Sequence, residues 1–277
     1  MKAKILLQGA VLWVGGLWLF AGGAEVAQGF PGGGPGFGLL PVTDATPSCA
    51  GCHANTKAEY MRDVPADAPL NAVNQLMSEK HYKAIEQGAD AYKLLPAAER
   101  EKLLKQVKVI DQNSSISIKA PREVARGKPI EVEVSAKGGI GPGSSVMLVD
   151  SNLRMQARPV QGNGWLIVGP PKVIGPDGKP QTFWVDKRFT GLGKNVNFVV
   201  VGGGADVDKG SYPSWKITWA LQAPAKAGKY TLAAAFLYGT EEPNEHKAKG
   251  KWTLPPGGLL GPSGRILFSE VIEVEVK

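Results

Sequence analysis

From Ser114 to Lys277, apolar and polar residues alternate in short stretches, and this period of two constrains the fold most. Successive side chains of a strand point to opposite faces of a sheet, so the pattern predicts eight or nine strands instead of helices. The 36 glycines and 21 prolines of the chain supply turns between them. The stretches are SISIK, IEVEVSA, VMLVD, GWLIVG, TFWVD, VNFVVVG, WKITWAL, KYTLAAAFLYG and RILFSEVIEVEVK. Many short strands without helical pattern between them predict an antiparallel β-sandwich over residues 113–277.

One corner of this sandwich resembles a feature of immunoglobulin-like folds. The sequence APAKAGKY carries a proline and a glycine shortly before Tyr230. In immunoglobulin-like sandwiches a tyrosine at such a corner hydrogen-bonds backbone a few residues upstream. No cysteine follows residue 52, so the resemblance is to sandwiches that lack the inter-sheet disulfide.

The preceding residues, 44–112, have helical spacing instead. One predicted helix starts near Asp67, has Pro69 in its first turn and ends at Gly88. Its apolar stripe is Leu70, Val73, Met77, His81 and Ala84. A second helix starts at Pro96, buries Leu103, Leu104, Val107 and Ile110, and ends at Asp111 or Asn113. These patterns predict a small all-α domain before the sandwich, and therefore an α+β multidomain chain.

The N-terminal residues 1–24 indicate export. Lys2 and Lys4 precede an apolar run from Ile5 to Ala24, which ends in small residues suited to cleavage. This is typical of a secretory signal peptide. An uncleaved membrane anchor is the alternative, because twenty residues can just span a bilayer. Residues 25–43 are rich in glycine and proline and are predicted to form a spacer.

Both cysteines of the chain, Cys49 and Cys52, lie in the pentapeptide CAGCH, which ends in His53. A closed zinc site needs about four protein ligands, and the chain has few thiols and histidines. A thioredoxin-like dithiol belongs to a βαβ pattern, whereas this context is helical. A disulfide across so short a loop would be strained. Covalent attachment of haem suits the motif best, because each thiol adds across one vinyl group and the histidine can then reach the iron.

This motif, within an exported chain, resembles the c-type cytochromes, and the resemblance covers residues 44–112. It implies one covalently attached haem c, with Cys49 and Cys52 as the thioether sites and His53 as the proximal iron ligand. The sixth ligand is less defined. His81 is favoured, because a histidine on an apolar helix face needs a partner when buried. Met77, one turn earlier, is the alternative, and a thioether ligand would give a higher potential.

The resemblance predicts an exported, periplasmic or extracytoplasmic electron-transfer protein without catalytic residues. The sandwich would be a docking module for a redox partner. Residues 113–277 carry 21 basic and 14 acidic side chains, which would suit an acidic partner or an anionic surface. The alternatives are a haem enzyme or gas sensor with a displaceable sixth ligand, and a structural subunit of a redox complex. Export and a dispersed basic excess argue against nucleic-acid binding.

Two further segments are candidate functional sites. The loop 240–264 contains His246 and several lysines, and could dock a partner or form a variable surface loop. Asp206 and Asp208 alternate in a glycine-rich turn, which fits either a calcium site or, better, a plain hairpin turn.

Overall fold

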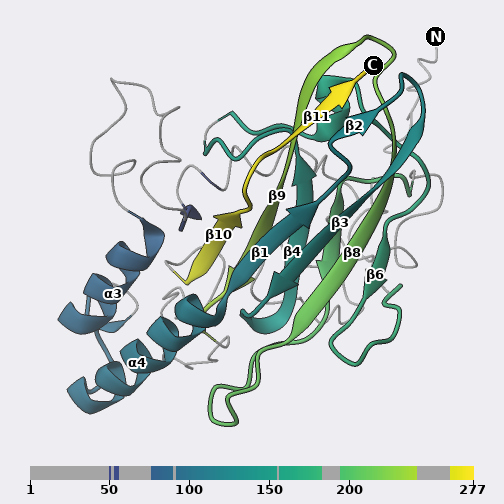
Figure 1. The fold of residues 1–277 in the computed structure, drawn as a ribbon. Coiled ribbons are helices and arrows are strands. Elements are labelled where there is room, and N and C mark those ends of the chain that lie inside the picture. The colour runs from purple at the N-terminus through teal and green to yellow at the C-terminus, as the bar shows by residue number, and fades with distance from the viewer. Residues whose placement is uncertain are drawn as a thin grey trace, which may run out of the picture.

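The computed structural model of the protein describes residues 50, 53–55, 76–89, 92–154, 156–182, 194–241 and 263–277. In this part of the chain, two β-sheets pack face to face and two α-helices lie at one side of them (Figure 1). The helices are α3 (Met77–Gln87) and α4 (Ala97–Asn113), and a short 3-10 helix is η5 (Val160–Asn163). The strands are β1 (Ser115–Lys119), β2 (Glu123–Val124), β3 (Pro129–Lys137), β4 (Ile140–Val149), β5 (Leu166–Ile167), β6 (Lys172–Ile174), β7 (Phe198–Val201), β8 (Ser214–Gln222), β9 (Gly228–Gly239), β10 (Gly264–Phe268) and β11 (Ile272–Val276).

The first sheet has the order β1-β3-β8, and both β5 and β6 pair with the far side of β8. The second has the order β2-β11-β9-β4-β7, with β10 also paired to β9. All these pairings are antiparallel except the short one between β2 and β11. The predicted antiparallel sandwich over residues 113–277 is therefore present.

The main core lies between the sheets and follows the alternation of the sequence. In β3 and β8, every second residue is buried. Burial of these apolar side chains is the main favourable term in the stability of such a sandwich. Its largest fully buried side chains include Trp165, Trp215, Trp219 and Phe236.

The second sheet is apolar on both faces. Alternate residues of β9, such as Ala234 and Phe236, belong to the main core, whereas Ala233 and Ala235 belong to a second cluster. Consecutive buried residues in one strand require cover on both sides of the sheet. The second cluster comprises Ala50, Met147, Val149, Ala157, Phe198, Ala233, Ala235, Leu237, Ile266 and Phe268. Residue 50, from the cysteine motif, is thus packed on the outer face of this sheet.

The predicted local features can be compared with the observed elements. SISIK forms β1 with the predicted bounds, and the last predicted stretch is divided into β10 and β11. The Tyr230 hydroxyl donates to the Lys226 carbonyl at 2.9 Å, which confirms the predicted tyrosine corner. Asp206 and Ser211 exchange two backbone hydrogen bonds, as expected of a hairpin turn. The stretch TFWVD lies largely outside the described residues.

The predicted helix boundaries at Gly88 and Pro96 are confirmed. Gly88 caps α3 in the left-handed conformation, with φ of 63°, which costs glycine least. Pro96 precedes α4, and Val107 and Ile110 are buried. The earlier part of the first predicted helix, including Leu70 and Val73, lies outside the described residues.

The prediction of an α+β multidomain chain with a small all-α haem domain is wrong. Strands dominate the described residues, whose only α-helices are α3 and α4. Their own cluster has just three fully buried members, Ile85, Tyr92 and Val107. Ile110 of α4 belongs to the sandwich core instead. Helical periodicity shows that one face of a helix is buried, but it does not show which element covers that face. Here the sandwich covers part of the apolar face of α4.

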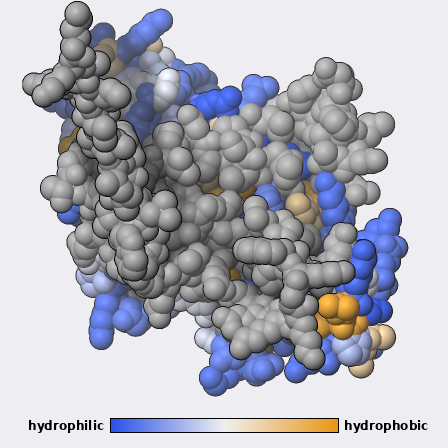
Figure 2. Space-filling view, turned by 180° about the vertical axis from the view of Figure 1, so that it is seen from behind, coloured by the Kyte–Doolittle hydropathy of each residue, from blue (hydrophilic) through white to orange (hydrophobic). Residues whose placement is uncertain are grey.

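Within the described residues, no helix has the length and apolar character needed to cross a membrane. The predicted signal peptide or anchor (1–24) and the spacer (25–43) lie outside those residues. Where described side chains reach the surface on the back of the molecule, they are mostly hydrophilic (Figure 2). Large exposed apolar side chains in the described part are limited to Leu94, Leu166 and Val168.

Candidate functional site

The end of the CAGCH motif is attached to the sandwich through β10 (Figure 1). Ala54 forms a parallel bridge with Ile266, and the Asn55 amide donates to the Ile266 carbonyl at 2.8 Å. The first residue of α3 joins this contact, because the Met77 amide donates to the Ala54 carbonyl at 3.0 Å. The motif, the helix and the strand thus form one hydrogen-bonded unit. Cys49 and Cys52 lie outside the described residues.

A buried arginine holds the first half of the motif. Arg154 is 1% exposed, and its Nε donates to the Ala50 carbonyl at 3.0 Å. The same carbonyl accepts from the Ala54 amide at 3.1 Å, as in one turn of helix. Ala50 itself is fully buried in the outer cluster of the second sheet. Ala50, one of the two residues between the cysteines, is therefore fixed by apolar packing and by a charged donor.

His53 is oriented by a backbone group of β10. Its Nδ1 lies 3.1 Å from the Gly264 carbonyl oxygen. A carbonyl oxygen can only accept, so Nδ1 carries the proton and a neutral ring keeps its lone pair on Nε2. Burial lowers the pKa of His53, the bond to Gly264 opposes this shift, and the positive charge of Arg265 adds to it. Near neutral pH the imidazole is therefore a neutral potential ligand through Nε2.

Gly264 allows the ring of His53 to approach the strand. A Cβ atom at position 264 would lie 3.2 Å from Nδ1 and 3.5 Å from Cε1 of His53. The distance to Nδ1 is tighter than most real Cβ contacts, whereas the distance to Cε1 is ordinary, so a larger residue would require the ring or the strand to shift by a few tenths of an ångström. The hydrogen bond and the close contact together depend on glycine at this position.

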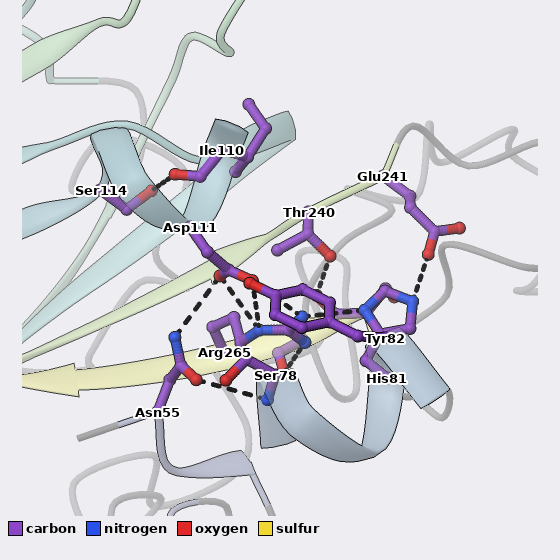
Figure 3. Close-up of polar contacts among 12 residues, drawn as sticks. Asn55, Ser78, His81, Tyr82, Ile110, Asp111, Ser114, Thr240, Glu241 and Arg265 are labelled. Atoms are coloured by element: carbon purple, nitrogen blue, oxygen red, sulfur yellow. Dashed lines mark hydrogen bonds and ion pairs between the residues drawn. The ribbon is translucent and has the colours of Figure 1, made fainter. Parts of the chain in front are cut away.

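His81 is fully buried and both of its ring nitrogens have protein partners (Figure 3). Arg265 Nη2 lies 2.8 Å from Nδ1, and since a guanidinium only donates, Nδ1 accepts. The other nitrogen, Nε2, contacts Oε1 of Glu241 and lies 2.6 Å from the Tyr92 hydroxyl. Burial lowers the pKa of His81, the hydrogen bond to Glu241 opposes this, and Arg265 lowers it further.

Asp111, near the end of α4, accepts hydrogen bonds from four residues. Arg265 is 1% exposed. Its Nε lies 3.1 Å from Oδ1 of this carboxylate, and its Nη2 lies 3.1 Å from Oδ2. The hydroxyls of Tyr82 and Tyr238 donate to the two oxygens at 2.7 and 3.0 Å, and the Asn55 amide lies at 3.5 Å. Burial raises the pKa of both tyrosines, and Asp111 raises it further. Both oxygens of Asp111 are thus hydrogen-bonded to protein groups (Figure 3).

Glu241 is buried but only partly satisfied. Its Oε1 accepts from the Tyr92 hydroxyl at 2.6 Å, whereas its Oε2 is buried and has no hydrogen-bond partner among the described residues. Burial and the neighbouring carboxylate both raise the pKa of Tyr92, which therefore stays protonated and donates. Asp111 pairs with Arg265, whereas Glu241 contacts His81, which is itself bonded to Arg265.

The described site residues are thus brought together in part. His53, Met77 and His81 all belong to segments that contact β10, directly or through Ala54 and Arg265. Among described residues no cluster of three or more metal-binding side chains was found. The sequence analysis missed Arg154, Arg265 and Asp111 as site residues, and Glu241 appeared only within a long loop. A charged residue inside the apolar stretch RILF was the one available signal for Arg265.

Comparisons with known proteins identify no family for this chain. No family model matches, and no curated protein matches. Among solved structures, the solution structure of the CARDB domain of PF1109 from Pyrococcus furiosus is 14% identical, with a TM-score of 0.23, over 59% of this chain and 94% of that domain. The crystal structure of the same domain in complex with di-metal ions has 14% identity and a TM-score of 0.22, over 60% of this chain and 90% of that one. CfaE, the adhesive subunit of the CFA/I fimbria of enterotoxigenic Escherichia coli, has 10% identity and a TM-score of 0.25, over 60% and 49%. No argument about function follows from similarities this low.

Proposed function

We propose that this protein carries one haem c, attached through Cys49 and Cys52 with His53 as proximal ligand, and that it transfers single electrons outside the cytoplasm. One observation of the structure supports the proposal above all: His53 donates from Nδ1 to the Gly264 carbonyl. Histidines that bind metals usually donate their other nitrogen to such a group, which fixes the tautomer and the ring orientation. The geometry of His53 fits that requirement, and the adjoining CxxC sequence fits covalent attachment.

The residues around the motif have defined roles in this proposal. Arg154 and the buried Ala50 anchor the chain between the cysteines, so the thiols would be presented from a rigid base. Gly264 orients His53, and α3 is tied to the motif through Met77. A haem, when bound, would supply reversible one-electron chemistry at its iron. The protein would contribute position, exclusion of water and fixed charges.

His81 is the proposed sixth ligand, with Met77 as the alternative. Coordination through Nε2 of His81 would require this nitrogen to leave Glu241 and Tyr92 and to give up its proton. If Nδ1 took that proton, it could no longer accept from Arg265, so the arginine would have to move. His81→Ala is then expected to abolish the six-coordinate, low-spin optical and EPR spectrum. An unchanged spectrum would rule out His81 as the sixth ligand. The same measurement on Met77→Leu would test whether the Met77 thioether is the ligand.

The sandwich is proposed as the docking module for a redox partner protein. Its basic excess would steer an acidic partner, and weak charge-guided encounters suit electron transfer. An uncleaved N-terminus would add attachment to a membrane. The haem would not belong to a separate cytochrome domain, because the segment that follows the motif is bonded directly to β10.

The primary test is covalent haem in protein exported by a host that matures c-type cytochromes. The expected result is a mass increase of one haem that survives denaturation, together with a c-type absorption spectrum. Cys49→Ala with Cys52→Ala should lose both, whereas Ser78→Ala, which leaves the motif intact, should retain them. Purified wild-type protein without covalent haem would overturn the proposal.

A haem enzyme or gas sensor is the second candidate, and one observation favours it. Both nitrogens of His81 already contact protein groups, so a sixth position left open to a small ligand fits the observed geometry. Carbon monoxide distinguishes the two functions. Rapid formation of a carbonyl adduct by the reduced protein would favour the second candidate, and resistance would favour electron transfer.

A further inference from the structure

The carbonyl of Gly264 links the proposed haem ligand to a buried ion pair. It accepts from His53 Nδ1 at 3.1 Å, and Nη1 of Arg265 lies 3.4 Å from the same oxygen. Arg265 is in turn bonded to Asp111 through Nε and Nη2. Asp111 also lies within reach of Asn55, two residues after His53. The ion pair therefore contacts the motif from two directions.

Both members of this pair are screened from water. The side chain of Arg265 is 0% exposed and that of Asp111 is 7% exposed. Charges in such surroundings act over longer distances than surface charges, because little solvent or salt lies between them and their target. The pair also has a fixed geometry, since two tyrosine hydroxyls hold the carboxylate.

We propose that Arg265 and Asp111 set the midpoint potential of a haem held by His53, Arg265 raising it and Asp111 lowering it. The inference rests on the proposed function. Oxidation adds one positive charge at the iron, so a nearby cation disfavours the oxidised form and a nearby anion favours it. Arg265 lies closer to His53, because it shares the acceptor of the histidine, whereas Asp111 lies behind the guanidinium.

A purely structural role would give a different result. Loss of either partner would then loosen the same contacts and expose the haem in the same way, and both variants would shift the potential in one direction. Opposite shifts require that the charges themselves act. Other charges face the same region, namely Lys80 towards His53 and Glu241 beside His81, and these stay unchanged in the variants below.

The experiment is a potentiometric titration of the full-length, haem-loaded protein. Arg265→Gln should lower the midpoint potential and Asp111→Asn should raise it. Each shift should change the ratio of oxidised to reduced protein about tenfold at fixed solution potential, which corresponds to about 59 mV for one electron. The double variant Arg265→Gln/Asp111→Asn should return close to the wild type, since both charges are removed. Arg126→Gln and Asp177→Asn make the same charge changes at exposed positions and should have little effect.

The outcomes separate this inference from the function on which it rests. Shifts in the same direction, or no shift in protein with an intact haem c spectrum, would overturn the inference and leave the proposed function standing. Wild-type protein without covalent haem would overturn both. If Arg265→Gln alone fails to fold, the rise expected for Asp111→Asn and the return expected for the double variant still decide the result, because the double variant removes both charges of the buried ion pair.

Discussion

His53 and Gly264 are 211 residues apart in the chain, yet the imidazole Nδ1 lies 3.1 Å from the glycine carbonyl. This bond connects the motif near the N-terminus to the penultimate strand of the sandwich. The proposed iron ligand is therefore oriented by a strand of the sandwich, which lies outside residues 44–112.

Gly264→Ala should displace the ring of His53. The new Cβ would lie 3.2 Å from Nδ1, so either the ring or the strand must shift, at a cost of about 1–3 kcal/mol in the free energy of unfolding. Haem-loaded protein should also show an altered low-spin EPR spectrum. Gly162→Ala is the matched control, because a Cβ there meets no atom within 4 Å. Equal stability and spectra for the two variants would contradict the close contact.

Arg154→Met should destabilise the region around Ala50. The variant keeps much of the side-chain volume but removes the charged donor to the Ala50 carbonyl, which is worth about 1.5–3 kcal/mol. Faster amide exchange of residues 50–55 and reduced covalent haem are the expected readouts. Arg126→Met, at an exposed position, should leave both unchanged. Wild-type exchange rates in Arg154→Met would show that the motif is held by apolar packing alone.

Tyr92→Phe should weaken the buried network around Glu241. Removal of the hydroxyl takes one hydrogen-bond donor from Oε1 of Glu241, whose Oε2 has no donor among the described residues. The free energy of unfolding should decrease by about 1–3 kcal/mol. Chemical denaturation measures this directly. Tyr212→Phe provides the comparison, since that ring is half-buried and its recorded contact is with the Lys137 ammonium through the ring face. If Tyr92→Phe lowered the free energy of unfolding by less than Tyr212→Phe, the Tyr92 hydroxyl would add no stability.

Stability should decrease as the pH falls below about 6.5, the usual pKa of histidine. The pKa values of His53 and His81 are lowered in the folded protein, chiefly by burial. The unfolded chain then binds more protons than the folded chain, so the free energy of unfolding rises with pH through this window and is fully present above it. Haem-free protein with Cys49→Ala and Cys52→Ala isolates this effect from iron binding. Adding His81→Gln should flatten the profile, and an unchanged slope would show that His81 does not contribute.

Local sequence was sufficient for most elements of the sandwich and for the helix ends. Alternation at SISIK defines β1 because one face of a strand is buried whatever its neighbours are. Gly88 and Pro96 mark helix ends because their backbone preferences are local. The spacing of the cysteine motif likewise predicts covalent haem, and the mass measurement tests this prediction.

Tertiary structure alone decided what surrounds that motif. Arg265 faces the same side of the sheet as Tyr238 because the two are opposite residues in the β10–β9 pairing, and this register brings it to Asp111 on α4. Neither the sequence around Arg265 nor the sequence around Asp111 indicates that these two side chains meet. In the described part of the chain the helices pack on the sandwich, and their own cluster has three fully buried side chains, too few for a separate core. Sequence determined the periodic elements and the candidate ligands, whereas long-range pairing decided which charges and which carbonyl they meet.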